Sequence, residues 1–291
     1  FIVGPRLNAA GRLDDMSVGI ECLLADSTAS ARTKAENLHA LNRERRDIEQ
    51  SMQTDALAQL EALNLDQPDL PFAMTLYDPN WHQGVIGILA SRIRERVYRP
   101  TLIFADSEEG MLKASGRSIP GLHLRDALDQ VAARYPGLLT KFGGHAMAAG
   151  LTLAKADFDP FCEAINAVVA DALDHVPPEP VAMSDGSLAP GDLTVSFAEQ
   201  LAAGGPWGQH FAEPVFDNTF VVRRHRIVGE KHLKLTLESG GIEVDAIAFN
   251  IDVTEWLAEP LTQLGALYRL DVNDYRGTRS PQLVIETFWP H

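Results

Sequence analysis

A proline-rich segment divides this chain into two parts of different character. Prolines occupy three of the last four positions of His175–Pro180, and clustered prolines favour extended, solvated backbone. Before this segment, strand-like and helix-like stretches alternate. After it, strand-like stretches separated by Gly or Asn turns follow one another. We therefore expect an α/β unit, with helices packed on a sheet, followed by a β-rich unit.

Residues 27–63 are expected to form one long helix ahead of the sheet. Apolar residues from Leu38 to Leu63 recur at intervals of three, four and seven, as they do along one face of a helix. The residues between them are mostly Glu, Arg, Lys and Gln, which are good helix formers. Asp26 or Ser27 can cap its first turn.

Alternating strands and helices are predicted from residue 71 onwards. The expected helices cover 83–97, 122–134 and 157–173, the last capped by Asp157. The expected strands cover 72–77, 101–105, 111–115 and 148–153.

Five strands are predicted beyond the proline-rich segment, with a short helix near 254–257 between the third and fourth. The strands cover 216–228, 232–238, 242–250, 264–272 and 282–288. This order is typical of an OB-fold barrel, a common binder of single strands, although other small barrels also fit the spacing. Phe220, Tyr268, Tyr275 and Arg276 are candidates to contact bases, whereas Phe216 and Phe249 are expected in the core.

Two adjacent glycines followed by a histidine, Gly143-Gly144-His145, form the first motif that suits an anion. Glycines let the backbone turn sharply and approach a ligand closely. The histidine adds a donor that can carry charge near neutral pH. The alternative is an ordinary turn.

Two further motifs offer arginines and hydroxyl groups. Ser115-Gly116-Arg117-Ser118 combines a guanidinium fork with two hydroxyls, as in bidentate phosphate binding, or is an exposed strand end. Near the N-terminus, Pro, Asn and two Gly within eight residues predict a shaped loop. The arginines of that loop, Arg6 and Arg12, are either anion clamps or surface charge.

The net charge of −15 argues against a protein that binds nucleic acid over its whole surface. It leaves room for local basic tracks or, alternatively, for solvated faces balanced by nearby acids. One basic cluster spans Arg92 to Arg99, and a second comprises Arg223, Arg224, Arg226, Lys231 and Lys234. His82 lies at a predicted helix start, where free N–H groups favour anions, although local capping is the alternative role.

These motifs, in this order, resemble one family: the bacterial RecJ single-stranded-DNA exonucleases of the DHH phosphoesterase superfamily. The resemblance extends over essentially the whole chain. It runs through GPRLNAAGRLDD, WHQGVIGILASRI, SGRS, GLHLRDAL, KFGGHAMAAGL, GPWG and RGTRS.

The resemblance implies four regions. Residues 1–26 would be the end of the DHH catalytic domain, 27–66 a connecting helix, 67–175 the DHH-associated α/β domain and 176–291 the OB domain. The family's Asp-His-His triplet is absent, as is an Asp-x-Asp beside a strand and a glycine turn. We therefore expect a C-terminal piece that contains neither catalytic residues nor metal ligands, binds no metal and is inactive alone.

The family reaction is 5′→3′ hydrolysis of single-stranded DNA in repair and recombination, with two Mn²⁺ or Mg²⁺ ions held by the DHH domain. By resemblance, phosphates would contact Ser115, Arg117, Ser118, Gly143, Gly144 and His145. Arg6, Asn8 and Arg12 would border the metal site. The DNA path would include His82 and the second basic cluster.

The expected partner is single-stranded DNA, with single-stranded-DNA-binding protein as a further partner and a monomeric state. Other readings are a DHH hydrolase of oligonucleotides or cyclic dinucleotides, or a non-catalytic binding module. Cys22 and Cys162 lack CxxC or zinc-ligand spacing, which is typical of reduced thiols in a cytoplasmic protein. No apolar run approaches the roughly eighteen residues of a membrane span.

Overall fold

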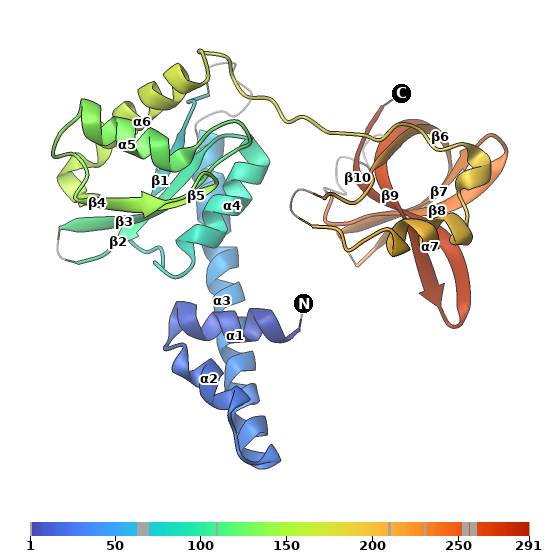
Figure 1. Ribbon diagram of the computed structural model, residues 1–291, viewed down its shortest axis with the longest axis horizontal. Helices are drawn as coiled ribbons and strands as arrows, with labels where there is room; N and C mark the ends of the chain where they lie inside the picture. The colour runs from blue at the N-terminus through green and yellow to red at the C-terminus, as the bar shows by residue number, and fades with distance from the viewer. Residues whose placement is uncertain are drawn as a thin grey trace. The chain divides into compact units, whose positions relative to one another are not determined.

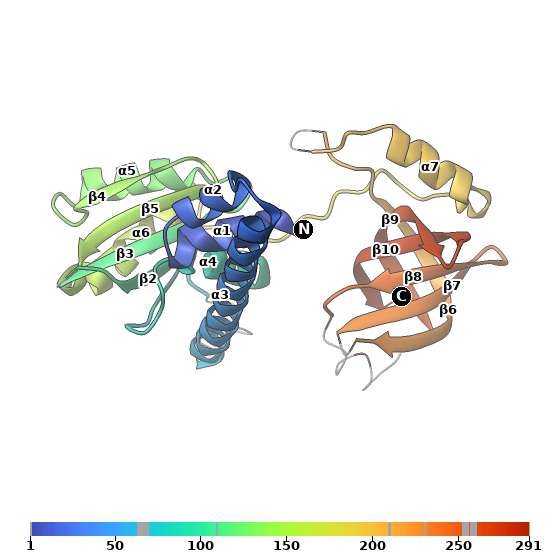
Figure 2. The same cartoon turned by 90° about the horizontal axis from the view of Figure 1, so that it is seen from below.

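The chain divides into two compact units, Phe1–Pro180 and Val181–His291. The computed structural model describes residues 2–62, 70–108, 110–208, 211–229, 231–251, 256 and 261–290. Figure 1 and Figure 2 show the α/β unit in blue to yellow-green and the barrel unit in gold to red. Among the described helices, none has the length and apolar character needed to cross a bilayer.

Three helices open the first unit: α1 (Val3–Leu13), α2 (Ser17–Leu23) and α3 (Thr28–Ala62). The long helix predicted at 27–63 is confirmed in α3, and the Ser30 N–H donates to Ser27 Oγ at 3.2 Å, so Ser27 caps it. The loop predicted near the N-terminus is wrong, because those residues form α1. Pro5 is accommodated because it lies in the first turn, where its missing N–H has no helical partner.

A five-stranded sheet follows, in the order β1-β2-β3-β5-β4. Its strands are β1 (Met74–Tyr77), β2 (Thr101–Asp106), β3 (Met111–Arg117), β4 (Lys141–Gly144) and β5 (Ala148–Ala154). β1 and β2 are parallel, and the other neighbours are antiparallel. β4 was not predicted: the two glycines at 143 and 144 end a strand, and the turn lies after them, at 145–147.

Helices cover both faces of this sheet. On one face, α3 and α4 (Ile86–Val97) pack against β1 and β2, through residues such as Leu89 and Ile103. On the other, α5 (Leu124–Arg134) and α6 (Phe158–Ala172) enclose a second core around Phe104 and Phe161. Figure 1 shows α4 and α5 on opposite sides of the sheet.

Three predicted helix starts move by one to three residues, because α4, α5 and α6 begin at Ile86, Leu124 and Phe158. Gln83 lies in a turn before α4, and its side chain donates to the Asp106 carbonyl at 2.8 Å. The 3₁₀ turn Lys155–Asp157 precedes α6, and the Asp157 side chain makes no capping hydrogen bond, so the predicted cap is wrong. Both free cysteines, Cys22 and Cys162, are half-buried.

The second unit is a closed barrel preceded by a short helical segment. It contains the 3₁₀ turn Pro190–Asp192, α7 (Val195–Ala203), β6 (Phe216–Val228), β7 (His232–Ser239), β8 (Ile242–Ala248), β9 (Gln263–Tyr275) and β10 (Thr278–Pro290). The order β10-β8-β7-β6-β9 closes through antiparallel β9–β10, with β8 and β10 parallel. This is the predicted five-stranded OB barrel. Of the helix predicted near 254–257, only Trp256 lies within the described residues, and it is helical.

The barrel core explains most of the aromatic residues of this unit. Phe216, Phe220 and Tyr268 are buried, and the Tyr268 hydroxyl donates to Asn218 Oδ1 at 2.6 Å. Phe220 and Tyr268 are therefore core residues and not base platforms. Phe249, predicted in the core, is 51% exposed and packs edge-on against His232.

Candidate functional site

Three elements of the first unit meet on one face of its sheet: the C-terminal turn of α1, the start of α4 and the last residues of β3. Arg12 of α1 donates from Nη1 to the Gly84 carbonyl at 2.9 Å. A Cβ atom on Gly87, in the first turn of α4, would lie 3.0 Å from Ser115 Oγ and 3.1 Å from Arg117 Nη2. Arg12, Ser115 and Arg117 thus gather beside the start of α4.

Like charges are concentrated around Arg117. The pKa of this guanidinium is lowered, first by burial and then by the positive charges of Arg12 and Arg94. Its Nη1 donates to Ser115 Oγ at 3.1 Å and to the Gly116 carbonyl at 2.8 Å. Among the described residues, neither Arg117 nor Arg12 has an ion pair, and Arg94 pairs with its neighbour Glu95 at 3.3 Å. Such a group, which we call the arginine cluster (Arg12, Arg94 and Arg117), suits an anion.

Glycines allow this close approach. A Cβ on Gly84 would overlap the Arg12 carbonyl, so α1 can lie against this turn only if residue 84 lacks a side chain. Gly87 is buried against the Ser115 and Arg117 side chains. The sequence therefore keeps room for the arginine cluster by placing glycines where α4 begins.

His145 lies at the same end of the sheet as Arg117. Its N–H donates to the Ala148 carbonyl at 2.8 Å, and Ala148 pairs with Arg117 across β3 and β5. One strand therefore separates His145 from Arg117, a backbone distance of about 10 Å. Alternation along β3 places Arg117 on the sheet face that α4 partly covers, and His145 is exposed just beyond the end of β4.

The two glycines before His145 have different roles. Gly144 has φ +149°, and a Cβ there would lie 2.5 Å from Ala149 Cα, so the fold itself requires glycine. Gly143 is exposed, and a Cβ atom at this position would meet only open space. Only Gly143 is free to serve a ligand by its small size.

Two predicted phosphate ligands are placed elsewhere. Ser118 is 1% exposed and donates to the Leu122 carbonyl at 2.8 Å, so its hydroxyl stabilises a turn and does not face the arginine cluster. Arg6 donates to His39 Nδ1 on α3 at 3.2 Å and to the Ile2 carbonyl at 2.5 Å. It is not among the arginines that act on Arg117.

Asn8 and His82 both lie near Arg12. Asn8 is exposed on α1, one turn before Arg12 and on the same helix face. His82 Nδ1 accepts a hydrogen bond from the Gly84 N–H at 3.0 Å, which is the local capping role. Its ring is otherwise exposed beside the turn that Arg12 contacts.

The basic cluster of the barrel unit is largely paired with acids. A β-bulge between Val222 and Arg224 turns consecutive arginines outward. Arg223 pairs with Glu238 at 2.5 Å, Arg224 with Glu243 at 3.4 Å and Lys234 with Asp245 at 3.0 Å.

Two basic residues of this cluster differ from the others. Within the described residues, Arg226 and Lys231 have no ion pair, and both are exposed. Arg226 also lines a hollow of about 410 Å³ together with Arg224, Lys234 and Thr236. Arg226 and Lys231 are the members of the cluster best able to meet an external anion.

The residues described here do not fit a two-metal centre. Across the described ranges, no three His, Cys, Asp or Glu side chains lie close enough together to hold a metal ion. No chemical step is therefore assigned to a metal held by these residues.

Sequence reasoning overlooked some members of the site. Arg94 was recognised only as part of a basic run, although it follows Gly87 by seven residues and so shares its helix face. Lys113 and Lys141 drew no attention, yet both are exposed on the sheet face that carries Arg117. Their register could be inferred only once β4 was known to be a strand.

Two family models match the chain: the DHHA1 domain over residues 70–171 and the RecJ OB domain over residues 184–287. The single-stranded-DNA-specific exonuclease RecJ of Dickeya dadantii (strain 3937) is 52% identical over 292 residues, covering 100% of this chain and 51% of the relative. The enzyme of the same name from Escherichia coli (strain K12) is 49% identical with the same coverage. The chain thus spans about half the length of these curated relatives.

Solved structures agree with this relationship. RecJ from Thermus thermophilus in complex with Mg²⁺ has a TM-score of 0.79 and 28% identity, covering 100% of this chain and 43% of that one. The Mn²⁺ complex has a TM-score of 0.79 and 29% identity, covering 100% and 41%. From the domain order, the identity and the shared fold, the chain belongs to the RecJ family, of which it carries the DHHA1 and OB domains.

Proposed function

We propose that this chain supplies the DNA-binding part of a single-strand-specific 5′→3′ exodeoxyribonuclease of DNA repair and recombination. The arginine cluster, with Ser115, holds a backbone phosphate near the 5′ end of the strand. Gly143 and His145 contact a neighbouring phosphate from the same sheet face. The reaction is metal-dependent hydrolysis by the whole enzyme, with Mn²⁺ or Mg²⁺ held by residues outside this chain.

The observation that carries the proposal is the gathering of Arg12, Arg94 and Arg117, in which no carboxylate of the described residues pairs with Arg117. Partly buried like charges repel one another, so the arrangement is costly unless an anion joins it. A phosphate can accept paired hydrogen bonds from a guanidinium and a third from Ser115. The names and metal complexes of the relatives support phosphodiester hydrolysis as the reaction.

The barrel is proposed to hold the strand further from its end. OB barrels bind single strands through basic grooves and exposed aromatic rings. Arg226 and Lys231 are the favoured phosphate contacts, and Tyr275, which is 62% exposed at the β9–β10 turn beside Arg276, is the favoured base contact. We further propose that the protein is monomeric and cytoplasmic. It would act together with single-stranded-DNA-binding protein.

The test measures binding of a 5′-phosphorylated single-stranded oligonucleotide to the purified 291-residue chain by fluorescence anisotropy. Arg117→Ala is expected to weaken binding about 10- to 100-fold, because a charge-assisted hydrogen bond contributes about 1.5–3 kcal/mol. Arg125→Ala is the matched control, since Arg125 lies exposed on α5 and its one ion pair among the described residues is with Asp129, at 3.8 Å. It is expected to change affinity less than two-fold.

A second measurement tests whether the 291-residue chain binds DNA without hydrolysing it. With Mn²⁺ and the labelled strand, the 291-residue chain is expected to bind without releasing mononucleotides. Mononucleotide release that persists in every nuclease-free preparation would contradict the assignment of hydrolysis to residues outside this chain. Equal affinities of the Arg117→Ala and Arg125→Ala variants would contradict the phosphate site.

A further inference from the structure

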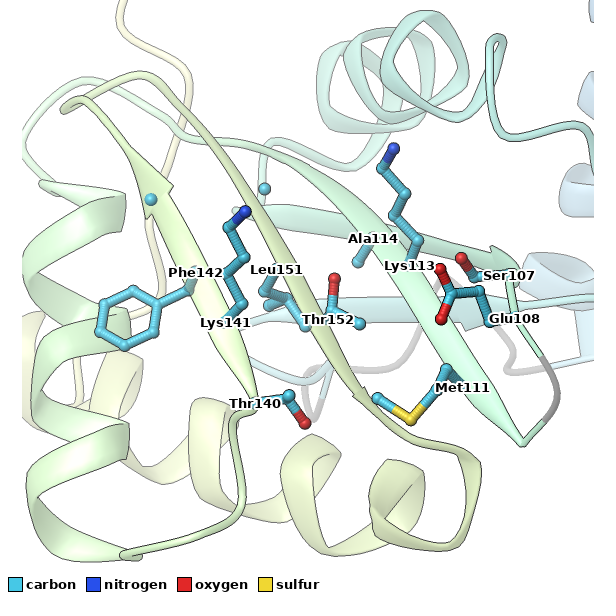
Figure 3. Close-up of a pocket in the computed structure, with 12 residues that line it drawn as sticks. Ser107, Glu108, Met111, Lys113, Ala114, Thr140, Lys141, Phe142, Leu151 and Thr152 are labelled. Carbon is cyan, nitrogen blue, oxygen red and sulfur yellow. The ribbon is translucent and has the colours of Figure 1, made fainter.

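Among the described helices, none packs over the β4 and β5 part of the sheet face that carries Arg117. α3 and α4 pack over β1, β2 and part of β3, whereas β5 and β4 expose alternate residues on that face. A hollow of about 530 Å³ lies here, and its floor includes Lys113, Lys141, Gly143, Gly150 and Thr152. Figure 3 shows the Lys113, Lys141 and Thr152 side chains rising from the same side of the sheet.

The register arranges these residues in rows across the strands. Arg117 pairs with Ala148, beside His145, and forms the first row with it. Gly143 and Gly150 pair with each other and with Ser115 in the second row. Lys113, Thr152 and Lys141 form the third row, which we call the lysine row. Adjacent rows are about 7 Å apart along the strands.

The fold does not require glycine at either glycine position of the second row. Neither Gly143 nor Gly150 has a positive φ, and a Cβ on Gly150 would meet only the Ala114 carbonyl, at an ordinary 3.5 Å. By contrast, a Cβ on Gly116 would crowd the buried side chains of Leu124 and Leu102, at 2.8 and 3.3 Å. Glycine weakens a strand interior, and where packing does not require it, it marks close approach by another chain or ligand.

The lysine row is positively charged without internal neutralisation. Among the described residues, Lys113 and Lys141 have neither an ion pair nor a side-chain hydrogen bond, and both are exposed. Glu108 lines the hollow beyond them, next to Ser107 and Met111. Its carboxylate makes that end less favourable for an anion and so limits the positive strip to the rows described.

We propose that this open face is a track for the phosphodiester backbone, in which the lysine row binds a phosphate two steps from the one at Arg117. The row spacing is comparable to the phosphate step of an extended strand, so the intermediate nucleotide lies over Gly143 and Gly150. Thr152 donates its hydroxyl between the two lysines. This assignment rests on the proposed function, because it takes the Arg117 phosphate as its origin.

Oligonucleotide length provides the test. The affinities of a 5′-phosphorylated dinucleotide and a hexanucleotide are measured for the 291-residue chain and for Lys113→Ala/Lys141→Ala. The double variant is expected to bind the hexanucleotide about 10- to 30-fold more weakly and the dinucleotide unchanged within two-fold. The salt dependence for the hexanucleotide is expected to become shallower by about 0.7 per lost phosphate contact.

A charge-matched control separates a local contact from a general loss of positive charge. Lys34→Ala/Arg125→Ala removes the same charge from positions that pair with Glu21 and Asp129. This variant is expected to bind both oligonucleotides as the parent does. An equal loss in the control would overturn the track.

The glycines give a test in which fold stability and binding move in opposite directions. Gly150→Ala is expected to leave Tm unchanged or to raise it by about 1–3 °C, while hexanucleotide affinity falls about five-fold. Gly144→Ala is the contrasting variant, because its positive φ and crowded Cβ predict a lower Tm. Unchanged hexanucleotide affinity in Gly150→Ala would overturn the role of the second row.

Failure of this inference is distinguishable from failure of the proposed function. If Arg117→Ala weakens both oligonucleotides but the lysine variant weakens neither, the Arg117 site stands and the track is wrong. If Arg117→Ala also has no effect, the proposed function itself fails. A third outcome is that poly-glutamate binds the parent chain more tightly than the lysine variant, while the hexanucleotide binds both equally. That result would assign the face to an acidic protein segment instead of DNA.

Discussion

Basic side chains gather on both units of this protein, but their neighbours differ. In the α/β unit, Arg12 and Arg117 have no ion pair among the described residues, and burial, followed by the positive charges of Arg12 and Arg94, lowers the pKa of Arg117. In the barrel unit, the charged nitrogens of Arg223, Arg224 and Lys234 lie 2.5, 3.4 and 3.0 Å from a carboxylate oxygen. The first group still requires an anion, whereas most of the second already has one.

The comparison teaches that counting basic residues in a sequence overestimates anion sites. A chain with a net charge of −15 has enough acids to neutralise an exposed basic cluster locally. Burying an arginine costs desolvation free energy, so a partly buried group without acids indicates a site more strongly than a longer exposed run. Four sets of variants can break or sharpen this comparison.

The largest expected contrast is between Arg117→Ala and Arg223→Ala. If Arg117 holds a phosphate as proposed, removing it deletes a charge-assisted contact, and affinity for single-stranded DNA should fall about 10- to 100-fold. Removing Arg223 mainly frees Glu238, its partner at 2.5 Å, so affinity should change less than two-fold. Anisotropy titrations of the two variants check this, and comparable losses would break the comparison.

A carboxylate introduced into the arginine cluster should pair with its arginines, as acids do with most basic residues of the barrel cluster. Ser115 Oγ already accepts a hydrogen bond from Arg117 at 3.1 Å, so Ser115→Asp places an acid within ion-pair distance. Affinity is expected to fall about 10- to 30-fold. Ser30→Asp, on the exposed start of α3, adds the same charge elsewhere and should have little effect. Equal affinities of the two variants would contradict the idea of a site set by local counterions.

The converse change, removal of acids from the barrel cluster, should increase the affinity for single-stranded DNA. Glu238→Gln, Glu243→Gln and Asp245→Asn together release Arg223, Arg224 and Lys234 from their acids. Affinity is expected to rise about three- to ten-fold at low salt, with a smaller gain at high salt because exposed charges are screened. Titrations at two salt concentrations measure this gain. A triple variant that binds no more tightly than the parent would show that these basic residues do not face DNA.

The smallest effect is expected at Ser118. Its buried hydroxyl donates to the Leu122 carbonyl at 2.8 Å, so Ser118→Ala should lower unfolding free energy by about 1 kcal/mol and Tm by about 2–4 °C. DNA affinity should remain within two-fold of the parent. Thermal unfolding and anisotropy check the two parts, and a large affinity loss at unchanged Tm would return Ser118 to the phosphate site.

The fold was largely predictable because its elements follow simple periods. The apolar repeat of α3 and the strand alternation of the barrel are visible in the sequence, and the strands at 216–228 and 232–239 were located almost to the residue. α1 was missed because Pro5 and two glycines look like loop signals, although a proline in a first helical turn is compatible with a helix.

The candidate site was less predictable because it depends on register and packing. The strand that bears Arg117 was expected to end at Ser115 but continues to Arg117. With that end point, alternation places Gly116 and Ser118 opposite to Ser115 and Arg117, and the burial of Ser118 follows. The meeting of Arg12, Arg94 and Arg117 joins segments far apart in the sequence, and no local pattern contains it.

The salt dependence of binding tests the central claim most directly. Slopes of log affinity against log salt are compared for the parent, for Arg12→Ala/Arg94→Ala/Arg117→Ala and for Arg223→Ala/Arg224→Ala/Lys234→Ala. If the arginine cluster holds phosphates, the first variant should lose about 2 units of slope, at roughly 0.7 per contact, and the second well under 1. A loss of slope in the barrel variant equal to or larger than that in the arginine-cluster variant would contradict the account.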